Sequence, residues 1–219
     1  NGYNNRTNTF TCATFTTGSG RNQAIDWGTG TWSITGTGSV VNVTSTALTS
    51  TPNTGTIKFT DTSSSSKTFV GGGFSYPNLL FSGVGTGVYI ITGSNTFVSI
   101  GSETAVHTVR FTAGTTQTVS ELRLDGSQGA RNTLESVTAG STWTISAASG
   151  VTIKARWVTL RDSIATGGAA FRAINSLNLG NTTGWFFLMN NATSRLASSN
   201  RQRVTVARAR ATSRLNTLS

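Results

Sequence analysis

The sequence of 219 residues is poor in charge: only 11% of its residues are charged, and only seven are acids. Globular chains commonly carry about 25% charged residues. Its single cysteine, Cys12, excludes an intrachain disulfide. With only one histidine as well, His107, the chain cannot build a zinc site from several His and Cys ligands. We therefore expect no metal and no cofactor.

Long apolar runs are also missing. The longest, Trp185–Met189, has five residues, whereas a helix that crosses a membrane needs about 20. Good helix formers are scarce, because threonine, serine, glycine and asparagine fill about half of the chain. The composition therefore argues against a membrane span and against a helical bundle.

What the sequence does have is a succession of short segments in which apolar and polar residues alternate. A period of two is typical of strands with one buried face. One apolar anchor can be chosen from each segment, and the anchors then recur about every 20 residues, as in stacked β-coils. These anchors are Phe59, Phe81, Ile100, Leu124, Ile145, Leu160 and Leu179.

The pattern predicts an all-β fold, with a parallel β-helix as the first choice and a β-sandwich or jelly roll as the alternative. Residues 1–55 lack the rhythm of 20, and we expect them to form an N-terminal β cap region that covers the end of the coil. Residues 56–187 are the predicted β-helix body. Residues 188–219 are the predicted basic C-terminal arm.

Several segments of the body are rich in threonine and glycine: Lys67–Gly73, Tyr89–Phe97, Gly114–Val119, Val158–Gly168 and Asn181–Phe186. These segments resemble the right-handed parallel β-helix repeats of phage virion proteins and bacterial surface proteins. The resemblance covers about residues 56–187 and implies a fold and a setting rather than a catalytic site.

Positive charge is concentrated at the C-terminus. From residue 190 onward the chain has six arginines and no acid. Such an arm suits an anionic partner, and the absence of aromatic residues that stack on bases makes nucleic acid an unlikely one. We interpret the arm as a device for docking to another protein; a merely solvated tail is the alternative. The candidate docking residues are Arg195, Arg201, Arg203, Arg208, Arg210 and Arg214.

Glu121, Arg123 and Asp125 lie at alternate positions of one predicted strand, which places them on one face. Glycoside cleavage uses two facing carboxyl groups, so a polysaccharide-degrading enzyme is one interpretation. We prefer a solvated row of charges that keeps neighbouring coils in register. We expect Arg161 and Asp162 to form a salt bridge at a corner. No serine lies in a nucleophile elbow that would pair with His107, so we predict no catalytic residue.

The first functional hypothesis is a non-enzymatic structural component of a phage virion, either a capsid decoration protein or a tail or fibre protein. Its partners would be other virion proteins in a symmetric assembly. The alternative is a secreted or cell-surface adhesin that binds glycans through exposed tryptophan and threonine rows. A β-helix enzyme that degrades polysaccharides is the third hypothesis.

Overall fold

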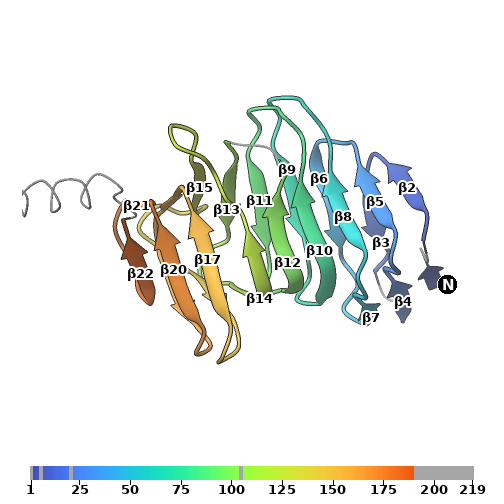
Figure 1. The fold of residues 1–219 in the computed structure, drawn as a ribbon. Coiled ribbons are helices and arrows are strands. Elements are labelled where there is room, and N and C mark those ends of the chain that lie inside the picture. Colours follow the sequence, from blue (N-terminus) through green and yellow to red (C-terminus); the bar gives the residue numbers. More distant parts are fainter. Residues whose placement is uncertain (1, 5–6, 20–21, 104–105, 190–219) are drawn as a thin grey trace, which may run out of the picture. The chain divides into compact units, whose positions relative to one another are not determined.

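The fold is a parallel β-solenoid. The computed structural model of the chain describes residues 2–4, 7–19, 22–103 and 106–189, and these form 22 strands and no helix. Neighbouring strands run parallel and wind through about eight turns, each of which stacks on the turn before it (Figure 1). A sandwich or jelly roll needs antiparallel pairs, so the predicted β-helix is confirmed and its alternative is wrong.

Each turn carries up to three strand positions, and these define three faces of the coil, which we number in the order in which the chain passes through them. The third face is the simplest, because it is an uninterrupted sheet of eight parallel strands. Its strands in spatial order are β3 (Phe15–Thr17), β6 (Gly38–Val43), β9 (Lys67–Val70), β11 (Tyr89–Thr92), β13 (Thr108–Phe111), β15 (Asn132–Ser136), β18 (Val158–Leu160) and β21 (Leu177–Asn178).

Three long strands in the middle of the coil, β10 (Ser75–Phe81), β12 (Thr96–Ser102) and β14 (Thr116–Arg123), serve both other faces. Their pairing register passes over Pro77, Val98 and Ser120, and the alternation of buried and exposed residues also breaks at Pro77 and Ser120. The first part of each strand therefore belongs to the first face, and the second part belongs to the second face.

The remaining strands extend these two faces toward the ends of the coil. The first face also holds β1 (Gly2–Asn4), β4 (Gln23–Asp26), β7 (Leu48–Thr51), β16 (Trp143–Ser146) and β19 (Ser163–Thr166). The second face also holds β2 (Thr9–Cys12), β5 (Thr31–Ile34), β8 (Thr56–Phe59), β17 (Thr152–Arg156), β20 (Ala170–Ile174) and β22 (Trp185–Leu188).

Apolar side chains from all three faces point inward and stack in columns. On the second face Ile57, Leu79, Ile100 and Leu122 pair in register, and none is more than 4% exposed. Burial of one such side chain contributes about 1.5–3 kcal/mol. Rings also stack between faces: those of Phe111 and Trp143 lie 3.8 Å apart and those of Phe81 and Tyr89 lie 4.3 Å apart.

Six of the seven predicted anchors share one core but not one column. Ile145 on β16 and Leu160 on β18 belong to the same turn, because each turn passes through several strands. Leu179 is 55% exposed, so its prediction as a core anchor is wrong. The predicted spacing of about 20 residues is close to the length of a central turn. Residues that pair between central turns are 21 or 22 positions apart, such as Leu79 with Ile100 and Ile100 with Leu122.

Residues 1–55, the predicted cap region, include strands on all three faces. Strands β5 and β6 pair with β8 and β9 of the body, whereas β1, β4 and β7 form a three-stranded sheet of their own. Phe15, Ile25 and Trp27 belong to the same hydrophobic core as the body. The described residues up to Leu188 form one compact unit. Apart from Leu188 and Met189, the predicted arm and its six candidate arginines lie outside the described residues.

Candidate functional site

The second face is interrupted between β14 and β17. Strand β14 pairs with β12 and, through its first part only, with β16; strand β17 pairs with β20. Within the described residues, no ladder joins the second part of β14 to β17. Two strand edges therefore face each other across a gap, and backbone groups on both edges lack the partners that an unbroken sheet supplies.

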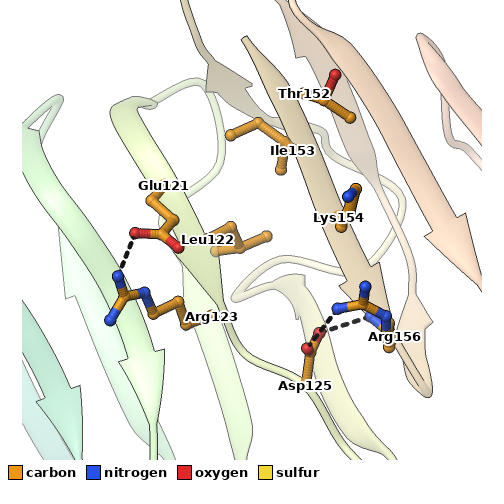
Figure 2. Close-up of a pocket in the computed structure, with 8 residues that line it drawn as sticks. All are labelled: Glu121, Leu122, Arg123, Asp125, Thr152, Ile153, Lys154 and Arg156. Carbon is orange, nitrogen blue, oxygen red and sulfur yellow. Dashed lines mark hydrogen bonds and ion pairs between the residues drawn. The ribbon is translucent and has the colours of Figure 1, made fainter.

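A pocket of about 290 Å³ occupies this gap, and we call it the β14–β17 groove. Figure 2 shows its side chains on the two facing strands. One end is closed, because Gly126 N donates to Arg156 O at 2.9 Å and Arg156 N donates to Asp125 Oδ1 at 2.8 Å. The lining residues are Glu121, Leu122, Arg123, Asp125, Thr152, Ile153, Lys154 and Arg156.

Charges of both signs line the groove. Arg123 and Glu121 form an ion pair with 2.6 Å between Nη2 and Oε2, and Arg156 binds Asp125 with 3.2 Å between Nη1 and Oδ2. The hydrogen bond from Arg123 lowers the pKa of Glu121, so this carboxyl stays ionised at neutral pH. Lys154 is exposed and has no carboxylate partner within the described residues.

Beside the groove, the outer surface of β17, β20 and β22 combines cations with apolar side chains. Lys154 pairs in register with Arg172, and Arg172 pairs with Phe186. Within the described residues Arg172 also lacks an acidic partner. Four exposed apolar side chains lie around this last turn: Leu177, Leu179, Phe186 and Leu188. We call these four side chains and Arg172 the last-turn surface.

The structure brings together the three predicted charged residues of β14 and the loop after it. Glu121 and Arg123 are exposed and Asp125 is half-buried. The sequence analysis missed their partners on β17, although the alternation of Thr152, Lys154 and Arg156 with buried residues placed them on the outside. The strand order, which brings β17 beside β14, was not readable from this alternation.

The predicted salt bridge between Arg161 and Asp162 is wrong. Arg161 binds Glu135 instead, and Arg110 binds the other oxygen of the same carboxylate at 2.8 Å. Asp162 has a positive φ of 54° and accepts hydrogen bonds from Gly140 N and Asn181 Nδ2. The left-handed backbone at Asp162 thus forms a corner that is held by amide donors.

His107 is buried, with 2% of its surface exposed, and its ring packs edge-on against Tyr89 at 5.1 Å. Burial and the nearby charge of Lys67 lower its pKa, so His107 is neutral at pH 7. Lys67 itself is only 1% exposed and binds Asp61 at 2.8 Å. This buried ion pair was not anticipated from the sequence, where Lys67 is one of many polar residues of a strand pattern.

The exposed tryptophan row expected for an adhesin is absent from the described residues. Trp27, Trp32, Trp143 and Trp185 are at most 9% exposed and belong to the core, and Trp157 is half-buried beneath the guanidinium of Arg131. A large aromatic ring in a coil contributes more to stability inside than outside, which explains this placement.

Among the described residues, no cluster of three or more His, Cys, Asp or Glu side chains is placed to hold a metal ion. The same residues include no helix of the length and apolarity that a membrane crossing requires. Comparison with protein-family models, with curated proteins and with solved structures gives no significant match for the chain.

Proposed function

We propose that this chain is a non-enzymatic structural component of a phage virion, a capsid decoration or a tail or fibre protein, that docks to another virion protein through its last turn. A parallel solenoid suits this role because its backbone hydrogen bonds follow the stack and give rigidity without disulfides. The observation that carries the docking proposal is the last-turn surface.

The last-turn surface has the composition of a protein interface. Exposed large apolar side chains elsewhere on the described coil are scattered, but at this end Phe186 and Leu188 lie on β22 next to β20, which carries Arg172, and Leu177 and Leu179 lie at or just after β21 on the third face. Aromatic residues and arginine are enriched at interfaces, and contiguous apolar patches mark them. The cations Lys154 and Arg172 also lie here without acidic partners, so the surface favours a partner that supplies carboxylates.

The partner is a different protein rather than a second copy of this chain. All seven acids of the sequence are described, and all of them already have partners. Five are in ion pairs, whereas Asp26 and Asp162 accept hydrogen bonds from amide groups. A second copy would therefore have to share or exchange one of these paired carboxylates with Lys154 and Arg172. The arginine-rich arm, whose sequence follows directly, adds charge of the same sign.

Support for the other two hypotheses is weaker. The tryptophans expected to bind glycans are in the core. The two carboxylates that a glycoside-cleaving site would use, Glu121 and Asp125, are each bound by an arginine. We therefore retain the virion as the proposed location.

The test begins with particles purified on a density gradient from the source culture. We expect mass spectrometry to find the chain in the particle fraction at a fixed ratio to the major capsid protein. Recombinant full-length chain should then bind particles that were grown without its gene. A Phe186→Ser, Leu188→Ser double variant should bind at least about tenfold more weakly, because interface anchors commonly contribute 2 kcal/mol or more.

Phe10→Ser is the matched control. Phe10 is 49% exposed and lies on strand β2 of the second face, at the other end of the coil. We expect its binding to remain unchanged. A variant that lacks residues 195–219 should keep the melting temperature of the coil and lose affinity for the particle. Recovery of the chain in a cell-wall fraction instead of the particles would contradict the proposal and favour the adhesin.

A further inference from the structure

We propose that the β14–β17 groove is a binding site for a small acidic saccharide, one or two sugar rings with a carboxylate. This inference does not depend on the virion proposal, since a decoration protein, a fibre and a surface protein can all carry such a site. The groove shares Lys154 with the cations named in the docking proposal, and its other lining residues are those of the gap itself.

The size and the walls of the groove limit the ligand. Its volume of about 290 Å³ lies just below the range of roughly 300–1,000 Å³ that ligand pockets occupy. Leu122 and Ile153 are at most 4% exposed and point into the core, so the side chains that reach the opening are polar or charged. A small polar ligand therefore fits better than an apolar one.

The backbone edges favour a ligand with many hydroxyl groups. Within the described residues, the second part of β14 and the facing edge of β17 share no ladder, so N–H and C=O groups of both strands look into the groove. A hydroxyl donates and accepts hydrogen bonds and can satisfy either kind of group. An apolar ligand would leave them without partners, which costs free energy.

The charges select an acidic sugar among hydroxylated ligands. Glu121 and Asp125 are fixed by their arginines and offer oxygens to hydroxyl donors, and the same carboxylates repel a polyanion such as nucleic acid. Lys154 lies opposite another cation, Arg172, in register. Like charges at directly opposite positions destabilise a sheet, and a bound carboxylate at Lys154 relieves this repulsion.

The experiment is ligand-observed NMR with the full chain. The probes are glucuronate, galacturonate and N-acetylneuraminate, and glucose and galactose are their neutral counterparts. We expect at least one acidic sugar to bind about tenfold more tightly than its neutral counterpart, the effect of one charge-assisted hydrogen bond. Lys154→Gln should abolish this preference, and Thr152→Trp, which fills the groove, should abolish binding of all probes.

Lys58→Gln is the matched control. Lys58 lies on β8 of the same face, outside the groove, and is paired with Glu103 at 2.8 Å. Its loss should leave sugar binding unchanged, and equal melting temperatures show that the variants are folded. Absence of binding for all three acidic sugars, equal affinity for acidic and neutral sugars, or an equal loss in Lys58→Gln would overturn the proposal. If inorganic sulfate displaces the sugar completely and binds with the same affinity, the groove is a simple anion site, and this result would also overturn the proposal.

Discussion

At the scale of single residues, the buried side chain of Lys67 forms an ion pair with Asp61. Lys67 donates from Nζ to Ser63 O at 2.8 Å in addition to its ion pair with Asp61, and it lies over the ring of Tyr89. Its hydrogen bond and that of Ser63 lower the pKa of Asp61 to about 2. A buried ammonium is tolerated only because this carboxylate and a carbonyl surround it.

This ion pair predicts an acid-sensitive contribution to stability. The pKa of Asp61 is lower in the folded chain than its ordinary value of 3.8. The stabilisation is therefore complete above about pH 4 and is lost as the pH falls toward 2. We expect a loss below about 2.5 kcal/mol, because part of the carboxylate is in contact with solvent. Urea unfolding at a series of pH values measures it.

Asp61→Asn should remove this part of the pH dependence and should also destabilise the chain at pH 7, since it leaves Lys67 buried without a counter-charge. The Asp61→Asn, Lys67→Met double variant should recover part of that loss. An unchanged acid profile in Asp61→Asn would show that other carboxylates govern acid unfolding.

At the scale of elements, one carboxylate links successive strands of the third face. Glu135 on β15 pairs in register with Arg110 on β13, and Arg161, which directly follows β18, binds its second oxygen. Glu135 has only 6% of its side chain exposed. Burial alone would raise its pKa, but the hydrogen bonds from Arg110 and Arg161 outweigh burial and lower it.

We therefore predict that Glu135→Gln is far more costly than the chemically identical change at Glu121. Loss of the buried carboxylate leaves two arginines facing each other and should lower the free energy of unfolding by about 3 kcal/mol. Glu121→Gln removes an exposed pair and should cost less than about 1 kcal/mol. Guanidinium unfolding of the two variants gives the comparison, and similar losses would mean that the three-residue network adds nothing.

At the scale of the whole molecule, the sequence predicted the class of fold but not the order of its strands. Alternation marks which residues are buried, and it located segments such as Trp32–Ile34 and Val109–Phe111 within β5 and β13. It carries no information about which strand pairs with which, so it assigned one anchor to each turn although a turn has three faces. The groove arises from a missing ladder, and for that reason no local pattern revealed it.

The interruption of the second face also has a mechanical consequence. Hydrogen bonds between turns run along the axis of the coil, so a pulling force between the first and the last turn is carried by every ladder that crosses a given level. At the level of the groove, the ladders that cross within the described part of the chain are those from β14 to β16 and from β15 to β18. Neighbouring levels have longer ladders, for example from β12 to β14. Under tension the coil should part first between the turn that ends with β15 at Ser136 and the turn that begins with β16 at Trp143, and force spectroscopy should record this event at lower force than later ones. A first rupture at another level would show that packing, rather than strand pairing, determines the mechanical strength.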